Sequence, residues 1–318
     1  MNLRPYIQIA RPDHWFKNIF MVLGIVIVAF YEPDRLVVSA VPTLFVAILA
    51  TCLVASSNYV INEILDAKTD LEHPEKCKRP IPAGEVNLTW AWVEWLVLAL
   101  VAFALASTVN SAFLLSAIGL WVMGLIYNVP PVRAKELPYV DVISESINNP
   151  IRLMLGWFAL VDNVLPPLSL MVSYWGLGAF LMATKRFAEL RSIGDGKRAA
   201  QYLRSFAYYT QERLLLSMFF YANLCALFGG VFIVRSKLEL LFAAPLIAGA
   251  MAYYLKLGLA HDSPTQSPER LYKERGFFAH IVVTGALFIC LMLLDIPELY
   301  ELFEVEQERT MQLWAFRS

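Results

Sequence analysis

Long apolar blocks, separated by short polar segments, alternate along the whole of this 318-residue chain. A membrane-spanning helix needs about 20 mostly apolar residues to cross a hydrocarbon core of roughly 30 Å. Nine blocks approach or reach this length: 16–31, 39–61, 89–108, 110–127, 140–161, 165–184, 214–234, 238–256 and 278–296. The pattern predicts an all-α, polytopic membrane protein of about nine transmembrane helices, in which the first helix is retained and not removed as a signal peptide.

Composition agrees with a membrane protein, and the distribution of basic residues predicts its orientation. Hydrophobic residues make up 58% of the chain and charged residues 17%, and the mean hydropathy is +0.55, which is too apolar for an ordinary soluble domain. With the N-terminus inside, 20 of the 26 Lys and Arg fall in the cytoplasmic segments. The positive-inside rule therefore predicts a cytoplasmic N-terminus and a C-terminus on the other side.

The longest polar segments are 62–88, 185–213 and 257–277, and each follows an even-numbered apolar block. A charged loop after the second block and another after the sixth predict a single domain, 1–318, built from two related halves of roughly 1–135 and 136–318. The third segment contains two prolines in "HDSPTQSPERLYKERG" and is typical of a loop with a short helical turn. The four cysteines show no CxxC pair and no metal-ligand spacing.

The first candidate site is "NEILDAKTD", directly after an apolar block. If the second helix continues past the membrane surface, Asn62, Asp66 and Asp70 stack on one face, because each four-residue step turns about 400°. Glu63 lies at the edge of the same stripe. Carboxylate and amide oxygens are hard ligands that suit Mg²⁺, which completes its shell with water and substrate phosphates.

Cationic residues follow this acidic stripe in "HPEKCKRPIPAG". Lys76, Lys78 and Arg79 are expected to contact the phosphate oxygens that a metal leaves uncovered. The alternative is a solvated helix end whose charges form salt bridges within the loop. The end of a bilayer-embedded helix favours the functional interpretation.

The second candidate site is "ATKRFAELRSIGDGKR", at the matching position after the sixth block. Lys185 and Arg186 precede Glu189 by four and three residues, and Asp195 follows in a turn flanked by glycines. These residues are candidates for binding substrate. The alternative is a positively charged membrane anchor held by salt bridges within the helix.

The third candidate site spans "YNVPPVRAKELPYVDVISESINNPIRLMLGW". Tyr127, Arg133 and Lys135 lie around a proline-rich loop where cationic side chains are placed to meet an anion. A helical stripe of polar residues then crosses an otherwise apolar block. It consists of Asp141, Glu145, Asn148 (or Asn149) and Arg152.

Ionisable residues inside a membrane are costly and normally face a cavity or a partner. A substrate cavity is one interpretation of this stripe. A structural network in which Glu145, Asn149 and Arg152 pair with each other is the other.

At this point the sequence resembles the UbiA superfamily of intramembrane prenyltransferases. "NEILDAKTD" fits the NxxxDxxxD pattern of that superfamily, and charged loops after the second and sixth helices fit its plan. The resemblance implies a helical bundle with a central cavity open to the cytoplasm. The ordered combination of motifs is more specific than NxxxDxxxD alone.

Within the superfamily, the chain is most similar to the decaprenyl-phosphate phosphoribosyltransferase branch. The matching pieces are "RPDHWFKN", which contains Lys17 and Asn18, then "HPEKCKRPIPAG", Arg152, and "KRFAEL" followed by "GDG". Glu63 stands where the branch usually has Asp, and "SESINNPIR" makes the fifth helix more polar than is usual there.

The resemblance implies a bacterial inner-membrane enzyme that transfers a 5-phosphoribosyl group from 5-phosphoribosyl-1-diphosphate to a polyprenyl phosphate. Its partners are an isoprenoid lipid, a phosphorylated sugar donor and the bilayer, with no nucleic acid and with a homo-oligomer left open. Mg²⁺, replaceable by Mn²⁺, is expected on Asn62, Asp66 and Asp70, with Glu63 in its outer shell. Lys76, Arg79 and Glu189 complete the expected catalytic set, and the remaining substrate-binding set is Lys17, Asn18, Tyr127, Arg133, Lys135, Asp141, Arg152, Lys185, Arg186 and Asp195.

Two alternatives from other classes remain open. One is prenyl transfer from a polyprenyl diphosphate to an aromatic or small polar acceptor, which requires no 5-phosphate. The other is a transporter or lipid-binding membrane protein, since transporters often break helices near the midplane and Pro150 lies within the fifth block. The acidic cluster lies at a helix end, which favours an active site.

Overall fold

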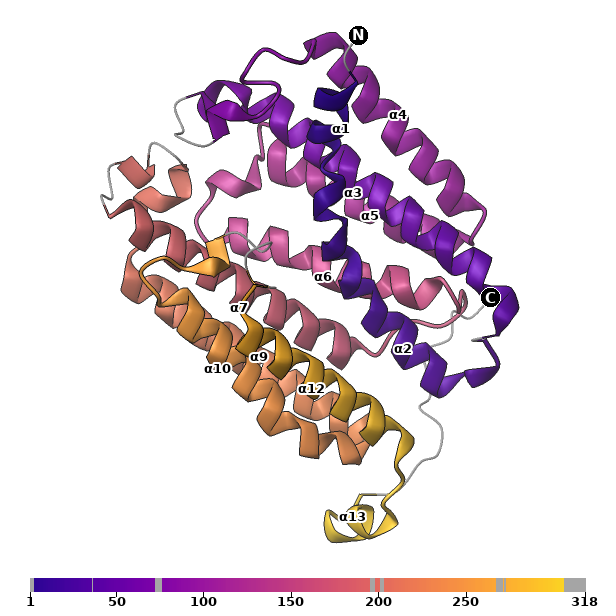
Figure 1. The fold of residues 1–318 in the computed structure, drawn as a ribbon. Coiled ribbons are helices and arrows are strands. Elements are labelled where there is room, and N and C mark those ends of the chain that lie inside the picture. Colours follow the sequence, from indigo (N-terminus) through magenta and orange to yellow (C-terminus); the bar gives the residue numbers. More distant parts are fainter. Residues whose placement is uncertain are drawn as a thin grey trace. The chain divides into compact units, whose positions relative to one another are not determined.

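A computed structural model of the chain describes residues 3–35, 37–71, 76–194, 198–200, 203–266, 271 and 273–305. All regular elements in these ranges are helices (Figure 1), which confirms the all-α prediction. The chain divides into two compact units. Unit 1 comprises Met1–Val164 with Tyr202–Ser205, and unit 2 comprises Leu165–Gln201 with Phe206–Ser318.

Unit 1 is built around one long helix, α3 (Val41–Asp70), which packs against α1, α4 and α5. Helix α6 packs against α2 and α5. The helices of this unit are α1 (Arg4–Ala10), α2 (Val22–Tyr31), α3, α4 (Leu88–Ser107), α5 (Ser111–Asn128) and α6 (Val140–Phe158). Its 3-10 segments are η1 (Pro12–Met21), η2 (Pro33–Arg35), η3 (Val38–Ala40), η4 (Lys76–Lys78), η5 (Ala134–Glu136) and the start of η6 (Arg204–Ala207).

Asparagine side chains begin two of these helices. The Asn87 side chain accepts a hydrogen bond of 2.9 Å from the backbone N–H of Thr89 at the start of α4. The Asn110 side chain accepts one of 2.8 Å from the N–H of Phe113 at the start of α5. An amide oxygen at this position satisfies a backbone donor that has no partner inside the helix. Local sequence therefore sets where α4 and α5 begin.

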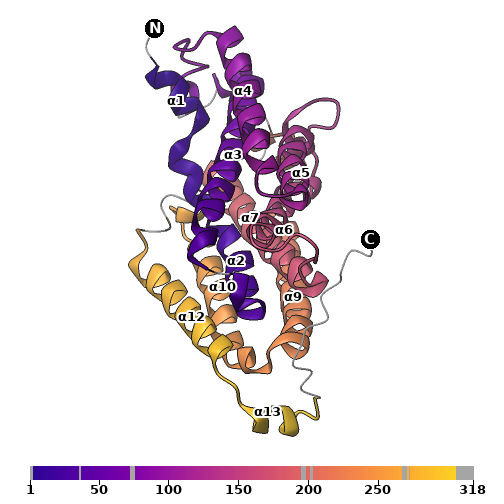
Figure 2. The same cartoon turned by 90° about the vertical axis from the view of Figure 1, so that its right-hand side faces the viewer.

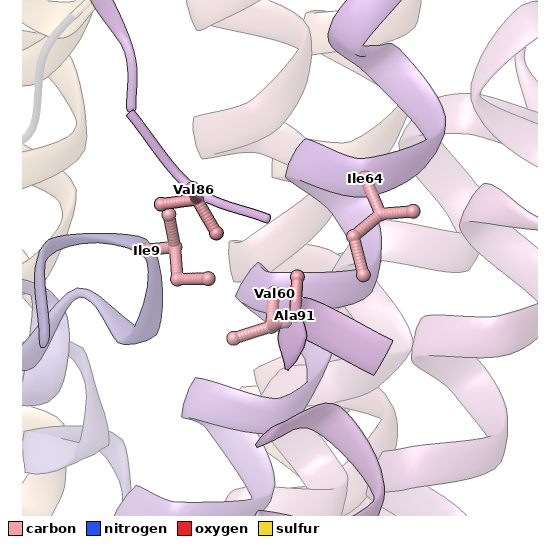
Figure 3. Packing of buried hydrophobic residues seen from close by; sticks show 5 residues of the cluster. All are labelled: Ile9, Val60, Ile64, Val86 and Ala91. Carbon is pink, nitrogen blue, oxygen red and sulfur yellow. The ribbon is translucent and has the colours of Figure 1, made fainter. Parts of the chain in front are cut away.

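Near the C-terminal end of α3, unit 1 has a small apolar core. Ile9 of α1, Val60 and Ile64 of α3, Val86 just before α4 and Ala91 within α4 are all buried and pack together (Figure 3). Because Val60 and Ile64 lie one turn apart on α3, they hold this helix against the N-terminal segment and against α4. The same segment of α3 carries the polar residues of the candidate site.

Unit 2 is organised around α7 (Leu168–Ile193), which lies beside α9 (Gln211–Ser236) (Figure 2). Helix α7 ends at Gly194, whose φ of 70° falls in the left-handed region that glycine adopts without strain. The remaining elements are η7 (Leu238–Ala243), α10 (Ala244–Gly258), η8 (Pro264–Gln266), α12 (Arg275–Leu293) and α13 (Pro297–Leu302). The short η8 confirms the helical turn expected in the third polar segment.

The buried carboxylate of Glu239 links two segments of unit 2. Glu239 is fully buried, accepts hydrogen bonds from the backbone N–H of Ile296 at 2.9 Å and the hydroxyl of Tyr300 at 3.0 Å, and lies 3.7 Å from the Lys237 ammonium. A buried charge is tolerated when it is paired and hydrogen-bonded in this way. Glu239 therefore links the α9–α10 connection to the segment between α12 and α13.

Seven helical segments in the described part of the chain are long and apolar enough to cross a membrane. They are α1 to α2 with η1 between them, α3 with η3, α4, α5, α9, α10 with η7, and α12. Helices α6 and α7 occupy the other two predicted blocks and are not among the seven. The chain is thus a multi-pass membrane protein, and nine crossings stay a prediction.

Helices α2 and α6 approach each other closely at two glycines. A Cβ on Gly24 would overlap the Leu153 carbonyl oxygen, and a Cβ on Gly156 would overlap the carbonyl oxygen of Met21. Helices in membranes commonly pack through small residues, because these let the backbones come close. This crossing fixes where α6 lies within unit 1.

We expect Gly156→Ala to destabilise unit 1 by about 1–3 kcal/mol, because the added methyl has to push two backbones apart. Gly119→Ala in α5 is the matched control, since a Cβ there meets no atom within 4 Å. The thermal unfolding midpoint in detergent measures both variants. Equal midpoints for the two would show that the close α2–α6 crossing is not required.

Candidate active site

Helix α3 is continuous through Asp70, as the motif requires. Asn62, Asp66 and Asp70 therefore lie on one face near its C-terminal end, with about one helical turn between neighbours. The side chains of all three are bound by residues from other segments of unit 1. The spacing predicts the common face of these three residues. The structure adds the residues that bind them.

Asp66 is bound by two cations from the segment between α5 and α6. Lys135 Nζ lies 2.6 Å and Arg133 Nη2 lies 2.9 Å from the same Asp66 oxygen, Oδ1. Oδ2 of Asp66 has no hydrogen bond within the described ranges. Arg133 also pairs with Glu136, with Nε 2.6 Å from Oε1.

Lys135 is itself buried, with only 5% of its surface exposed. Burial lowers the pKa of the Lys135 ammonium from its ordinary value, and the neighbouring Asp66 carboxylate opposes that shift. Lys135 also donates a hydrogen bond of 2.9 Å to Oδ1 of Asn128. The ammonium is thus held between a carboxylate and an amide oxygen.

Asn128 is the site residue that the sequence did not reveal. Its Oδ1 accepts hydrogen bonds from both Asn62 Nδ2 and Lys135 Nζ, and its Nδ2 donates to the carbonyl oxygen of Gly124 at 2.9 Å. Asn128 thereby connects the end of α5 to α3 and to the cationic loop. In the sequence, Asn128 is marked only as a polar residue at the end of an apolar block. Its half-buried neighbour Tyr127 was predicted as the site residue.

Asp70 has a different partner from Asp66. It is buried, with 4% of its surface exposed, and pairs with the guanidinium of Arg79. Lys76 lies in η4, three residues before Arg79 in the same loop. Arg79 therefore forms a salt bridge with Asp70, and contact of the cationic loop with phosphate oxygens stays a prediction.

Glu63 does not share these partners. It is 1% exposed, accepts a hydrogen bond of 3.1 Å from the backbone N–H of Ile81 and lies 3.7 Å from the guanidinium of Arg11. It thus joins the N-terminal segment and the loop after η4 to α3. Because its oxygens serve these contacts, we leave Glu63 out of the proposed metal ligands.

A second polar cluster in unit 1 surrounds Tyr59, nearly one turn before Asn62 on α3. The Lys17 ammonium lies 5.6 Å and the Arg11 guanidinium 5.9 Å from the centre of the Tyr59 ring, and the His14 ring meets it edge-on at 5.3 Å. Lys17 Nζ is also 3.2 Å from His14 Nδ1. Cations over an aromatic face are attracted by its negative quadrupole.

Arg152 of α6 belongs to the same region of unit 1. Its Nε donates a hydrogen bond of 3.1 Å to Oδ1 of the buried Asn18, whose Nδ2 lies 3.2 Å from the Cys52 sulfur. Asn18 therefore holds Arg152 in place, and contact of either residue with substrate stays a prediction. Asp141, at the start of α6, is fully buried, and Ser205 Oγ lies 3.4 Å from its Oδ2.

In unit 2, the predicted residues of α7 form ion pairs within the helix. Arg186 Nη1 lies 2.7 Å and Lys185 Nζ lies 3.9 Å from oxygens of Glu189. Arg186 is buried, with its guanidinium 5.7 Å from the centre of the Phe206 ring. The salt-bridge alternative is thus present, and binding of substrate by these residues stays a prediction. Asp195 lies outside the described residues.

The oxygen donors at the end of α3 fit a hard cation such as Mg²⁺ in kind. Asp66 and Asp70 supply carboxylates one turn apart, and Oδ2 of Asp66 makes no hydrogen bond to the described residues. No cluster of three or more His, Cys, Asp and Glu suited to a metal occurs in the described part of the chain. Any metal here would therefore complete its shell with Asn62, water and substrate oxygens.

Comparison with known proteins decides the family. The UbiA prenyltransferase family matches residues 18–282, which is most of the chain. The chain belongs to the UbiA prenyltransferase family. The match begins at Asn18 and ends within α12, so it includes the acidic face of α3 and the cationic residues that bind it.

Curated relatives in this family include several decaprenyl-phosphate phosphoribosyltransferases. The chain is 34% identical over 192 residues to decaprenyl-phosphate phosphoribosyltransferase of Mycolicibacterium smegmatis, which is 58% of this chain and 57% of the relative. It is 29% identical over 185 residues to the enzyme of that name in Mycobacterium tuberculosis, which is 58% of this chain and 59% of the relative. The matches thus span less than two thirds of these relatives.

A solved UbiA homologue from Archaeoglobus fulgidus, bound to GPP and Mg²⁺, superimposes on the chain with a TM-score of 0.66. The two share 19% sequence identity, and the match covers 91% of this chain and 100% of the homologue. A structure of that homologue bound to Cd²⁺ is also similar, with a TM-score of 0.64. At this identity the likeness establishes the UbiA fold.

Proposed function

We propose that the chain is a Mg²⁺-dependent transferase that moves a 5-phosphoribosyl group from 5-phosphoribosyl-1-diphosphate to a polyprenyl phosphate. The observation that carries this proposal is the end of α3, where Asp66 and Asp70 are bound by cations from other segments of unit 1. Carboxylates able to hold a metal, with Lys and Arg beside them, suit the diphosphate of such a donor. The similarity to phosphoribosyltransferases supports the same donor.

The acidic face of α3 is proposed to hold the metal. Asp66, Asp70 and Asn62 would hold Mg²⁺, and Mn²⁺ is expected to substitute for it. When bound, the ion would neutralise the diphosphate and stabilise it as a leaving group. In the structure, Lys135 and Arg133 form salt bridges with Asp66, and Arg79 forms one with Asp70.

These cations are proposed to move from the carboxylates to the diphosphate oxygens, with Lys76 adding charge from the same loop. Positive groups fixed near the departing oxygen stabilise the charge that develops there. The bond from ribose C1 to the diphosphate breaks, and diphosphate leaves with the electron pair. An oxygen of the lipid phosphate forms the new bond to C1 and needs no general base, because it is already anionic near neutral pH.

The active site is proposed to face the cytoplasm of a bacterial inner membrane, since the distribution of Lys and Arg favours a cytoplasmic location for this end of α3. The donor is water-soluble and would reach the site from that side. The polyprenyl chain would lie between helices in the bilayer. Two partners follow, a phosphorylated sugar and an isoprenoid lipid, and a homo-oligomer is left open.

Prenyl transfer is the second candidate. It is favoured by the similarity to 4-hydroxybenzoate octaprenyltransferase of Pectobacterium atrosepticum, at 31% identity over 129 residues, 39% of this chain and 42% of the relative. The Asp66 centre is compatible with either diphosphate donor, because the carboxylates and cations recognise the diphosphate and not the group attached to it. The attached group therefore has to be identified by experiment.

The test offers purified protein in detergent two substrate pairs with Mg²⁺. One is 5-phosphoribosyl-1-diphosphate with a polyprenyl phosphate, and the other is a polyprenyl diphosphate with 4-hydroxybenzoate. We expect a phosphoribosylated lipid by mass spectrometry, abolished by EDTA. A prenylated benzoate from the second pair, with no product from the first, would overturn the proposed donor and leave the α3 metal site in place.

A further inference from the structure

One face of α6 carries three polar side chains in a row. Glu145, Asn148 and Arg152 are separated by three and four residues, so they project within about 60° of one another around the helix. Asn149 borders the same face. The stripe lies within unit 1, where α6 packs against α2, α5 and η1. A charged carboxylate and a guanidinium in such a helix need a partner, because burying either alone is costly.

Asn148 has an acceptor atom that no described residue satisfies. The residue is 91% buried, and its Oδ1 makes no hydrogen bond within the part of the chain that the structure describes. Its Nδ2 donates a long hydrogen bond of 3.4 Å to Oε2 of Glu145. Buried polar atoms without a partner are uncommon, and an acceptor left in this state is explained by a donor that arrives with a ligand.

Glu145 and Arg152 do not neutralise each other. The described residues contain no ion pair between them, and the single hydrogen bond of Glu145 is the one from Asn148. Arg152 uses Nε to contact Asn18, and its two Nη groups make no hydrogen bond or ion pair to the residues that the structure describes. A self-paired network is therefore not what holds this stripe.

Arg152 is nevertheless fixed in position. Asn18 Oδ1 accepts from its Nε, and Asn18 is in turn held 3.2 Å from Cys52 on α3. Lys17, the residue before Asn18, places a second cation in this region of unit 1, beside Tyr59. The guanidinium thus presents its Nη edge while its stem is anchored, which suits a bidentate contact with a phosphate.

We propose that this α6 face binds a phosphorylated sugar, with Glu145 and Asn148 accepting hydrogen bonds from sugar hydroxyls and Arg152 binding the phosphomonoester. The inference rests on the proposed function and names the part of the chain that recognises the donor. The rise of about 6 Å along the helix from residue 148 to residue 152 separates the two kinds of contact. Asn18 acts as the positioning residue for Arg152.

A lipid phosphate offers the same phosphate chemistry to Arg152, but it carries no hydroxyl for Asn148 or Glu145. A prenyl chain offers neither. The unsatisfied Oδ1 of Asn148 and the carboxylate of Glu145 are acceptors, and a ribose 5-phosphate has hydroxyl donors beside its phosphate. The sugar phosphate is therefore the ligand that satisfies all three side chains.

Binding of three probes to the purified protein tests this directly. The probes are ribose 5-phosphate, butyl phosphate (the same phosphomonoester without hydroxyls) and a polyprenyl phosphate. We expect ribose 5-phosphate to bind at least about 10-fold more tightly than butyl phosphate, the order expected for hydroxyls bonded to buried acceptors, one of them charged. Asn148→Ala should remove most of that difference and leave the affinity for polyprenyl phosphate unchanged.

Asn148→Ala also tests its own folding, because it deletes an unsatisfied polar group and should keep or raise the thermal midpoint. Asn223→Ala is the matched control, since Asn223 lies on α9 and donates only to the carbonyl oxygen of Phe219 in its own helix. Arg152→Gln should weaken ribose 5-phosphate and butyl phosphate together. Weakening of polyprenyl phosphate alone would assign the site to the lipid and overturn the proposal.

Transfer assays separate this inference from the proposed function. If phosphoribosyl lipid is formed, Asn148→Ala should raise KM for 5-phosphoribosyl-1-diphosphate about 10-fold with a smaller change in kcat. An unchanged KM would overturn the α6 assignment and leave the reaction standing. If ribose 5-phosphate binds as expected but no phosphoribosyl lipid is formed, the proposed function fails and the sugar-phosphate site remains.

Discussion

Asp66→Ala should abolish transfer, with product formation falling at least about 10³-fold. Asp66 is the central carboxylate of the acidic face of α3, and it binds both Lys135 and Arg133. Losing it removes a proposed ligand of the metal that stabilises the departing diphosphate, an effect of several kcal/mol, and each 1.4 kcal/mol corresponds to about tenfold in rate. The measurement is product by mass spectrometry at saturating donor and Mg²⁺.

Two variants make this result interpretable. Asp66→Asn keeps the size and a hydrogen-bond acceptor for Lys135 but loses the charge, so it should be nearly as inactive while folding normally. Asp34→Ala, on the exposed η2, removes a carboxylate far along the chain from the site and should retain full activity. If Asp66→Asn kept more than a tenth of the activity, Asp66 would not be a metal ligand.

Lys135→Met should reduce both activity and stability. We expect transfer to fall about 10²-fold, the order found when one preorganised charge-stabilising donor is removed. The free energy of unfolding should fall by about 2 kcal/mol, because a buried carboxylate loses one cation, although Arg133 still binds it. Thermal midpoints and initial rates measured on the same preparation report the two effects.

Lys68→Met is the matched control for this variant, since Lys68 lies on α3 between Asp66 and Asp70 but is exposed. A double-mutant cycle with Asp66→Asn then isolates the contact between the ammonium and the carboxylate. We expect the two stability effects to be strongly non-additive. Additive effects would mean that Lys135 and Asp66 do not interact in the folded protein.

Much of this site was predictable from spacing alone. The four-residue steps from Asn62 to Asp70 predicted a common helix face, and α3 is continuous through those residues. The same spacing argument placed Glu145 and Arg152 on one face of α6. Such predictions succeed because the period of a helix depends only on local geometry.

What the spacing did not provide is the identity of partners from other segments. Asn128 is 66 positions from Asn62, with which it shares a hydrogen bond, and a single polar residue at a helix end has no period to mark it. Glu63 lies one position from Asn62 and was grouped with the acidic face. Its buried carboxylate instead contacts Ile81 and Arg11, because packing of η1 and the later loop decides its surroundings.

The helix bounds also show which features the sequence pattern predicts and which it does not. The second block was expected at 39–61, and the helix runs to Asp70, because hydrophobicity marks the membrane-embedded part and not the polar turns beyond it. The first block was expected as one helix at 16–31, whereas the chain forms 3-10 turns from Pro12 to Met21 before α2 begins. Asn18 and Lys17 lie on these turns.

Each of the three acidic residues of α3 is accompanied by a cation from the chain itself. The pairs are Asp66 with Lys135 and Arg133, Asp70 with Arg79, and Glu63 with Arg11. Three carboxylates at the end of one helix would otherwise repel each other and resist burial. Because these pairs already balance the charge, we expect the end of α3 to keep its shape without a bound ion. The proposed metal and donor would then be able to bind and leave without unfolding it.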